Sequence, residues 1–276
     1  MVKSPKVKVI VLRTAGTNCD VETADAFTMC GASADLVHIN ELARSEKSLN
    51  DYQIFAIPGG FTYGDDIASG KILANEVRYR LGGELKKFID RGKLIIGICN
   101  GFQVLVKSGI LPGASDKGLA ATLTFNDSGK FEARWVYLGS SLACPERSRG
   151  KPRVSRCVWT KGIKKIIYLP VAHGEGKFIT KDKSILRSLR RNNQIVFQYV
   201  DEKGRLAEVY PDNPNGSVDS IAGICDLTGR VLGMMPHPER HVFGTHHPRW
   251  TREGLKRFGD GLSIFQNGVN YVKTRL

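Results

Sequence analysis

The stretch KLIIGICNGFQ, residues 93–103, changes from the pattern of a buried strand to the pattern of a helix within a few residues. Its first part is a run of apolar and β-branched residues, and apolar side chains then recur at helical spacing. The sequence therefore predicts that Cys99 lies at a strand-to-helix corner. Gly97 and Gly101 carry no side chains, so the backbone can turn sharply there and a substrate can approach the sulfur.

The first half of the chain repeats this alternation of strand and helix. Helix-like segments begin near Val21, Leu42 and Asn75, and strand-like runs cover residues 7–12, 34–39, 53–58 and 93–98. Such alternation predicts an α/β fold with a mostly parallel open sheet flanked by helices. Ligands of these sheets bind at the carboxyl ends of the strands. The loops of interest are therefore RTAGTNCD (13–20), PGGFTYGDD (58–66) and CNGFQ (99–103).

The second half has strand candidates without regular helices between them, which predicts extra antiparallel strands. These candidates are EARWVYL (132–138), QIVFQYV (194–200), RLAEVY (205–210), SIAGIC (220–225) and VLGMM (231–235). A final amphipathic pattern suggests a closing helix that carries Leu255, Phe258, Leu262, Phe265 and Val269. Since there is no repeat and no linker, we expect residues 1–276 to form a single domain. Residues 139–160, rich in Ser, Arg and Pro, are expected to form an exposed basic loop.

The formal net charge of +14 does not by itself identify a partner. The excess of lysine and arginine lies mainly in residues 145–165 and 181–191. These stretches lack the interleaved aromatic residues of a base-stacking surface. We therefore expect a solvated basic face, with no nucleic acid as partner. No apolar run is long enough to span a membrane, and the six cysteines contain no CxxC pair. These features favour a cytoplasmic protein with reduced thiols.

The corner at Cys99 has the features of a nucleophile elbow, with sulfur in place of oxygen. Unpaired amides and the dipole at a helix N-terminus favour a thiolate. A cysteine nucleophile also needs a base, usually a histidine that a third group orients. Two histidine and glutamate pairs occur, His173 with Glu175 in AHGEG and His237 with Glu239 in PHPER. The second pair is favoured, because prolines flank its histidine, but both remain open at this point.

Backbone amides are the usual donors to the oxyanion of an acyl-transfer reaction. The amide of Asn100 is one candidate, and the PGG loop offers those of Gly60 and Phe61 at the same sheet edge. This loop is not closed by GKS or GKT, so it does not match a phosphate-binding loop. A second cluster of histidines lacks the spacing and the additional ligands of a metal site, and we expect loop histidines there. These are His241, His246 and His247.

Taken together, these features resemble the class I (triad-type) glutamine amidotransferases. Their G-x-C-x-G-x-Q signature is present as GICNGFQ (97–103), and their His-Pro-Glu ending is present at residues 237–239. Further stretches are similar to the members that act in purine biosynthesis. They are GTNCD (16–20), PGGFTYGDD (58–66), NDSGKFEARWV (126–136), AHGEGKF (172–178), NPNGS (213–217) and MMPHPER (234–240). The resemblance covers nearly the whole chain and fails across about residues 139–160.

The resemblance implies a flavodoxin-like fold and a division of roles among the residues. Cys99 would be the nucleophile, His237 the base and Glu239 its orienting carboxylate. Gln103 would bind glutamine, and the amides of Asn100 and of Gly60 or Phe61 would stabilise the oxyanion. The resemblance implies neither a cofactor nor a metal in this chain.

The resemblance also implies the partners of the chain. It would act as a glutaminase subunit that passes ammonia to a synthetase subunit, which uses ATP and Mg to act on formylglycinamide ribonucleotide. A small bridging subunit would join the same complex. Two alternatives remain, a stand-alone cysteine amidase or peptidase of the same fold and a non-catalytic basic binding module.

Overall fold

Nine strands form a continuous sheet in the order β2-β1-β3-β4-β11-β10-β9-β6-β7, in a computed structural model that describes residues 6–113, 118–140, 156–163 and 166–276. Two further strands, β5 and β8, form an antiparallel pair. The strands are β1 (Lys8–Arg13), β2 (Ser33–His38), β3 (Ile54–Ile57), β4 (Leu94–Ile98), β5 (Ala121–Thr124), β6 (Glu132–Ser140), β7 (Ile167–His173), β8 (Lys177–Thr180), β9 (Ile195–Val200), β10 (Ile221–Cys225) and β11 (Val231–Met234).

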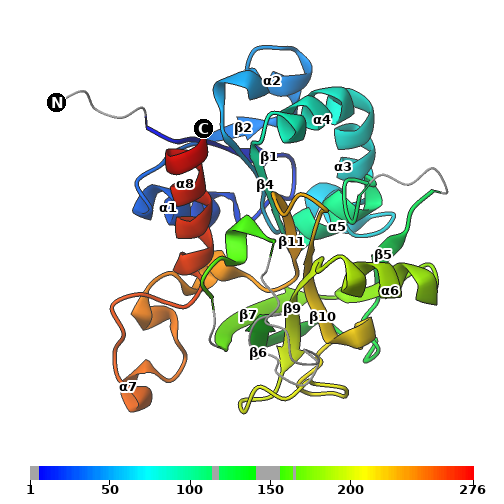
Figure 1. Cartoon of the computed structure of the whole chain (residues 1–276), viewed down its shortest axis with the longest axis vertical. Helices are drawn as coiled ribbons and strands as arrows, with labels where there is room; N and C mark the ends of the chain where they lie inside the picture. Colours follow the sequence, from blue (N-terminus) through cyan, green and yellow to red (C-terminus); the bar gives the residue numbers. More distant parts are fainter. Residues whose placement is uncertain (1–5, 114–117, 141–155, 164–165) are drawn as a thin grey trace.

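Helices cover both faces of this sheet. Figure 1 shows α1 and α8 on one side of it and α3 and α5 on the other. The α-helices are α1 (Asp20–Met29), α2 (Ile39–Ala43), α3 (Lys71–Glu76), α4 (Gly82–Asp90), α5 (Asn100–Lys107), α6 (Lys183–Arg191), α7 (Trp250–Glu253) and α8 (Leu262–Arg275). The helices α1 and α8 pack through Phe27 and Phe265, whose rings meet edge to face with centroids 4.9 Å apart.

The centre of the sheet consists of parallel strands that are buried on both faces. Every residue of β3, β4 and β11 is buried, as their continuous apolar runs predict for strands covered on both sides. The strand β4 pairs in parallel with β3 on one edge and with β11 on the other. The carboxyl ends of these three strands therefore meet at one edge of the sheet.

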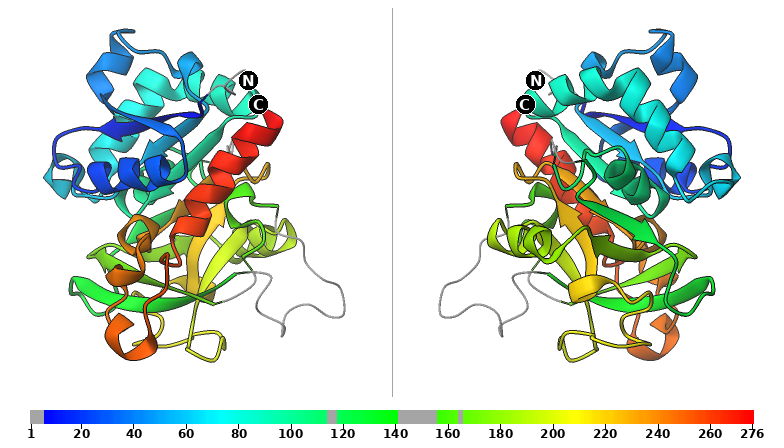
Figure 2. Two further views of the ribbon diagram at one scale, coloured as in Figure 1. Left: turned by 90° about the vertical axis from the view of Figure 1, so that its left-hand side faces the viewer. Right: turned by 90° about the vertical axis from the view of Figure 1, so that its right-hand side faces the viewer.

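The C-terminal half extends the sheet with antiparallel pairs, from β10 through β9 and β6 to β7. Figure 2 shows this green-to-yellow part adjoining the blue-to-cyan parallel part, with the red helix α8 running across both. The predicted fold class, a mostly parallel sheet flanked by helices with added antiparallel strands, is confirmed. Among the described residues, no helix combines the length and the apolar character needed to cross a bilayer.

The predicted strand at residues 205–210 is wrong. Leu206 makes only an isolated bridge with Val200, and Val209 and Tyr210 are exposed. The physical reason is that β9 is already paired on both edges, by β10 and β6. The returning chain is held in a tight turn instead, where Asp201 accepts a hydrogen bond from the amide of Arg205.

Several elements of the second half escape the sequence patterns, and β7 and α6 show why. The strand β7 contains Pro170, which argues against a central strand, but β7 lies at the edge of the sheet and tolerates it. The helix α6 lies between β8 and β9, contrary to the expectation of no regular helix there. Asp182 caps α6, because its Oδ1 accepts hydrogen bonds from the amides of Ser184 and Ile185 at 2.7 and 3.0 Å.

Two predicted boundaries also need correction. The closing helix begins at Leu262, and the two apolar residues expected on its first turns, Leu255 and Phe258, precede it and are exposed. The exposed basic loop expected at residues 139–160 is shorter than predicted at both ends. Gly139 and Ser140 belong to β6, and Trp159 is fully buried. Residues 141–155 of that prediction lie outside the described residues.

Candidate active site

Cys99 stands at a strained corner between β4 and α5. Its backbone has φ 51° and ψ −105°, a conformation that non-glycine residues rarely adopt, and its amide donates to the carbonyl of Met234 at 2.8 Å. The flanking glycines are required by space, because a Cβ on Gly97 would lie 2.5 Å from the Gly101 oxygen. A Cβ on Gly101 would lie 1.9 Å from the Ile57 oxygen. The sequence therefore folds into the elbow that its glycine spacing predicts.

The neighbouring strand β11 delivers His237 to the same edge. The last residues of β4 and β11, Ile98 and Met234, are register partners, so the chain segments that follow them leave the sheet side by side. The amide of His237 donates to the carbonyl of Pro170 at 2.8 Å, which fixes the backbone. The imidazole and the Glu239 carboxylate are buried, with Nδ1 and Oε1 2.5 Å apart. Since a carboxylate only accepts, Nδ1 carries the hydrogen.

The surroundings of His237 favour its charged form. Burial lowers the pKa of its imidazole, but the Glu239 carboxylate and the nearby Cys99 sulfur outweigh burial and raise the pKa well above the usual value. Among the described residues, Nε2 of His237 is buried without a hydrogen-bond partner. This nitrogen is therefore available for a proton from the nucleophile or for the leaving group.

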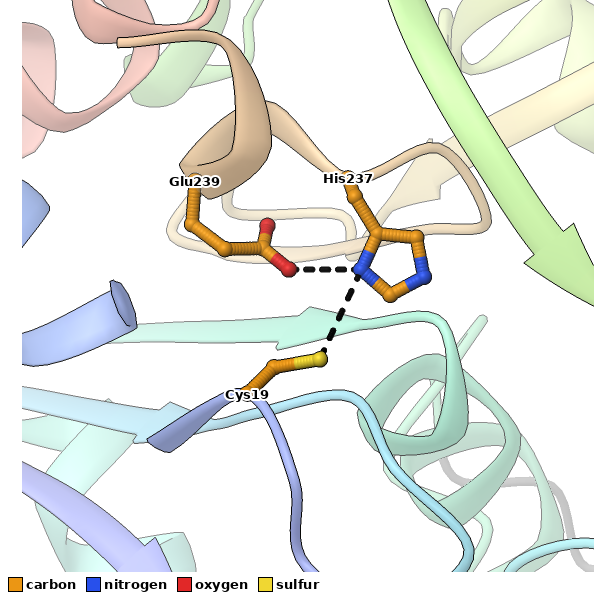
Figure 3. A group of neighbouring side chains, drawn as sticks. All are labelled: Cys19, His237 and Glu239. Atoms are coloured by element: carbon orange, nitrogen blue, oxygen red, sulfur yellow. Dashed lines mark hydrogen bonds and ion pairs between the residues drawn. The ribbon is translucent and has the colours of Figure 1, made fainter. Parts of the chain in front are cut away.

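Two residues that the sequence reasoning did not assign complete the setting of the imidazole. The first is Cys19, which precedes α1 and whose Sγ lies 3.9 Å from Nδ1 of His237. Figure 3 shows its side chain pointing toward the imidazole. Gly59 follows β3, and a Cβ there would lie 2.7 Å from Cε1 of His237 and 3.2 Å from Sγ of Cys19. The first glycine of the PGG loop thus makes room for the imidazole. The only signals in the sequence were the positions of GTNCD and PGG after predicted strands.

Gly59→Ala is expected to push the imidazole out of place and to lower turnover about 100-fold, because small misplacements of a catalytic group carry costs of this size. The measurement is the kcat for glutamate release from glutamine. Gly83→Ala in α4 is the matched control, since a Cβ there meets nothing within 4 Å. Near-ultraviolet circular dichroism checks that both variants keep the native packing. An unchanged kcat in Gly59→Ala would show that this contact does not place the base.

A pocket of about 390 Å³ opens above Cys99. It is lined by residues of three loops that meet at the sheet edge and by the first turns of α5. They are Gly60, Phe61, Asp65, Asp66, Ile67, Ser69, Cys99, Gln103, Phe125, Phe131, Ala172, His173, Gly174 and Glu175. The pocket is of a size that suits a small molecule, and the described residues of its lining include carboxylates but no lysine or arginine.

The geometry separates the candidate oxyanion donors. The amide of Phe61 already donates to the carbonyl of Gly16 at 2.8 Å. Asn100 is the first residue of α5, so its amide has no acceptor within the helix. Gly60 has φ 145°, and no backbone acceptor for its amide is found in the described part of the chain. The arrangement therefore favours Asn100 and Gly60 over Phe61.

Gln103 and Asn100 link the elbow to the loops around it. The Nε2 of Gln103 donates to the carbonyl of Glu175 at 2.7 Å, and its Oε1 accepts from Nδ2 of Asn100 at 3.0 Å. Asn100 also accepts from the Thr62 hydroxyl at 2.6 Å and donates to Asp65 at 3.2 Å. The sequence reasoning named Asn100 for its backbone amide but missed the role of its side chain, because only the contacts between loops reveal that role.

The competing pair, His173 and Glu175, is not joined. Glu175 accepts from Nζ of Lys107 at 3.3 Å and from the amide of Ser69 at 3.1 Å. His173 instead contacts Oδ1 of Asn126 through Nδ1 at 3.1 Å. Burial, together with the charge on His237, lowers the pKa of His173 to about 3, so it stays neutral. The geometry favours His237 with Glu239 as the pair that serves Cys99.

The three histidines near residues 241–247 lie apart from this pocket. His241 and His247 are buried beside Trp135, and His246 packs against Phe243. The Nδ1 of His241 donates to the carbonyl of Tyr168 at 2.7 Å. These contacts describe a packed aromatic cluster in the turns after β11, and His241 and His247 are buried in it.

Comparison with protein families and with curated proteins gives close matches. Residues 6–272 match the family described as the CobB/CobQ-like glutamine amidotransferase domain. The PurQ subunit of phosphoribosylformylglycinamidine synthase from Dehalococcoides mccartyi is 50% identical over 268 residues, covering 97% of this chain and 98% of the relative. The PurQ subunit from Archaeoglobus fulgidus is 44% identical over 283 residues, covering 97% of this chain and 98% of the relative.

Solved structures show the same architecture. A chain of the PurLQS structure from Thermotoga maritima has a TM-score of 0.70 and 31% identity, covering 97% of this chain and 100% of that chain. A glutamine amidotransferase from Thermotoga maritima has a TM-score of 0.53 and 16% identity, covering 99% of this chain and 100% of that chain. The second likeness concerns the fold alone.

Proposed function

Because this chain belongs to the family of CobB/CobQ-like glutamine amidotransferase domains, we propose that it is the glutaminase subunit of a phosphoribosylformylglycinamidine synthase in purine biosynthesis. It hydrolyses glutamine to glutamate and ammonia. The observation that carries the proposal is Cys99 on a strained elbow beside the buried pair of His237 and Glu239, at the floor of a pocket of about 390 Å³.

The first half-reaction forms a thioester. Nε2 of His237 takes the thiol proton, and the sulfur of Cys99 attacks the side-chain amide carbon of glutamine. The amides of Asn100 and Gly60 hold the oxyanion, in the role first expected of Asn100 with Gly60 or Phe61. The imidazolium then gives its proton to the leaving nitrogen, the carbon–nitrogen bond breaks, and ammonia departs. Glu239 keeps the hydrogen on Nδ1 throughout.

The second half-reaction releases glutamate. His237 takes a proton from water, the hydroxide attacks the thioester carbon, and the same amides hold the second oxyanion. The sulfur leaves as the thiolate and recovers the proton from the imidazolium. Gln103 binds the substrate at the pocket wall, positioned by its bond to the Glu175 carbonyl.

The ammonia is used elsewhere, because free ammonia becomes ammonium in bulk water and loses its nucleophilicity. The sequence contains no phosphate-binding loop that would activate an acceptor here. We therefore place ATP and Mg on a synthetase subunit that acts on formylglycinamide ribonucleotide, with a small bridging subunit in the complex. A cytoplasmic location belongs to the same proposal, in keeping with the free thiols of Cys19, Cys30 and Cys99. Residues 1–276 act as a single domain, since one sheet joins both halves.

The mouth of the pocket has the character of a docking surface. Ile67, Phe125 and Phe131 line the pocket and are 74%, 69% and 53% exposed, while Phe61 packs against Phe131. Clusters of exposed apolar side chains on a folded protein mark interaction sites. We assign this rim to the synthetase, because a partner that covers it closes the pocket against water and receives the ammonia.

Ile67→Asp is expected to weaken binding to the synthetase at least about tenfold, the usual effect of an important interface residue. Leu227→Asp is the control, because Leu227 is 55% exposed but lies in the turn before β11. The pocket is at the other end of that strand, where His237 follows it. The measurement is the dissociation constant of the complex by calorimetry. Equal affinities for the two variants would place the interface elsewhere.

The proposed function is tested by incubating the chain with glutamine, with and without the synthetase, and measuring glutamate. We expect slow hydrolysis by the isolated chain and faster hydrolysis in the complex. If glutamine stays intact even in the complex while another amide or a peptide is cleaved, the chain is a stand-alone cysteine amidase or peptidase of this fold. Tight DNA binding without any thiol reactivity would instead indicate a non-catalytic basic binding module.

A further inference from the structure

The buried side chain of Cys19 lies beside the catalytic base, and the mechanism gives it no role. The Sγ of Cys19, the Nδ1 of His237 and a carboxylate oxygen of Glu239 all lie within 4.8 Å of one another. Figure 3 shows the three side chains converging from the segment before α1 and from the turn after β11. All three residues are buried, and Oε2 of Glu239 has no hydrogen-bond partner among the described residues. The three side chains therefore provide one sulfur, one nitrogen and one unpartnered carboxylate oxygen that could bind a single metal ion.

These atoms match the preferences of zinc. Zinc binds cysteine sulfur at about 2.3 Å and histidine nitrogen or carboxylate oxygen at about 2.0 Å, usually as a tetrahedron, which puts neighbouring ligand atoms about 3.3 to 3.6 Å apart. The observed distance from Sγ to Nδ1 is 3.9 Å. The distance from Nδ1 to Oε1 is 2.5 Å, which is too short for two ligands of one zinc ion and has to increase. A rotation of the Glu239 carboxylate would allow this and would turn the unpartnered Oε2 toward the metal.

We propose that Cys19, His237 and Glu239 form an inhibitory zinc site on the Nδ1 side of the catalytic imidazole. The inference rests on the proposed function for its consequence, but not for the binding itself. On binding, the Cys19 thiol and Nδ1 of His237 each release a proton to water, and both form bonds to the metal. Glu239 then holds the metal instead of the Nδ1 hydrogen. The imidazole loses basicity at Nε2 and its alignment with Cys99, so glutamine hydrolysis stops.

Arg240 determines how readily the metal enters. Its Nη2 donates to Sγ of Cys19 at 3.0 Å, and its Nε donates to Glu22 at 3.0 Å. A guanidinium here repels a cation and occupies the sulfur that the metal needs. Its removal therefore has the opposite effect to removal of Cys19, which gives the proposal two variants with opposite expected results.

Binding is measured with Co²⁺ as a spectroscopic probe and Zn²⁺ as its competitor, on the full chain without glutamine. All variants carry Cys99→Ser, which removes the other sulfur near His237. We expect a thiolate-to-cobalt absorption band that Zn²⁺ abolishes by displacement. Adding Cys19→Ser should remove the band and weaken Zn²⁺ binding at least about tenfold. Adding Arg240→Met should strengthen binding, and Cys30→Ser, a partly buried thiol elsewhere, should change nothing.

Inhibition is measured in the chain with Cys99 intact, as the zinc concentration that halves glutaminase activity relative to each variant's own zinc-free rate. We expect a chelator to reverse the inhibition, Cys19→Ser to raise that concentration and Arg240→Met to lower it. The proposal is overturned if the cobalt band survives Cys19→Ser, or if the intact chain binds Co²⁺ through sulfur but Cys99→Ser does not. If zinc binds as described but the chain does not hydrolyse glutamine, the proposed function fails and the site stands.

Discussion

Cys99→Ala is expected to lower glutamine hydrolysis by at least about 10⁴-fold, because the loss of a covalent nucleophile leaves only binding and oxyanion stabilisation. The assay is glutamate release by the complex with the synthetase. Ammonia supplied from solution should still support synthesis by that complex at the normal rate, because only the supply of ammonia passes through Cys99. The elbow itself should persist, because its strained backbone is fixed by the bond from its amide to Met234.

Cys30→Ala is the matched control for this prediction. Cys30 is a free, partly buried thiol at the end of α1, outside the pocket lining, so both nitrogen sources should remain effective. An equal loss with glutamine and with ammonia in Cys99→Ala would mean that the substitution disrupts the complex. Retained glutamine hydrolysis would mean that another group attacks the amide.

His237→Ala and Glu239→Gln are expected to differ in size. His237→Ala should approach the loss caused by removing the nucleophile, while Glu239→Gln should cost about 10- to 100-fold less, as found when the orienting carboxylate of a triad is replaced. The reason is that Glu239 orients Nδ1 of His237 from 2.5 Å and does not itself move a proton. The measurement is kcat/KM for glutamine in the complex, with thermal unfolding to confirm that each variant is folded.

The pH profile gives Glu239→Gln a second readout. Burial lowers the pKa of His237, and the Glu239 carboxylate together with the Cys99 sulfur more than offsets burial. Removal of the Glu239 charge lowers the pKa, so the imidazolium that pairs with the thiolate is lost at lower pH. The alkaline limb of kcat/KM should therefore move toward lower pH. A larger loss in Glu239→Gln than in His237→Ala would contradict the assigned roles.

The central sheet could be predicted because its strands are buried on both faces. Continuous apolar runs of strand length beside turn residues, such as residues 93–98 and 231–235, are typical of fully buried strands. The edges were harder, since pairing depends on which neighbours are free. Residues 205–210 look like a strand, but no edge of β9 is left for them, and β7 looked unlike a strand because of a proline that only an edge tolerates.

The candidate catalytic residues could be proposed from the sequence because each follows the end of a predicted strand. Cys99 and His237 come to the same edge since β4 and β11 are parallel neighbours, a pairing that the sequence analysis did not predict, because it placed residues 231–235 among the antiparallel strands. Contacts between loops could not be foreseen. The space that Gly59 leaves for the imidazole, the bond that occupies the Phe61 amide and the approach of Cys19 depend on how separate turns pack.

The identity of the nucleophile is tested most directly by a diazo ketone analogue of glutamine, followed by mass spectrometry of the labelled chain. The account predicts one adduct per chain, on the sulfur of residue 99, formed in step with the loss of glutamine hydrolysis and prevented by excess glutamine. Activity lost with the adduct on Cys19 or on any other residue, while Cys99 remains unmodified, would contradict it.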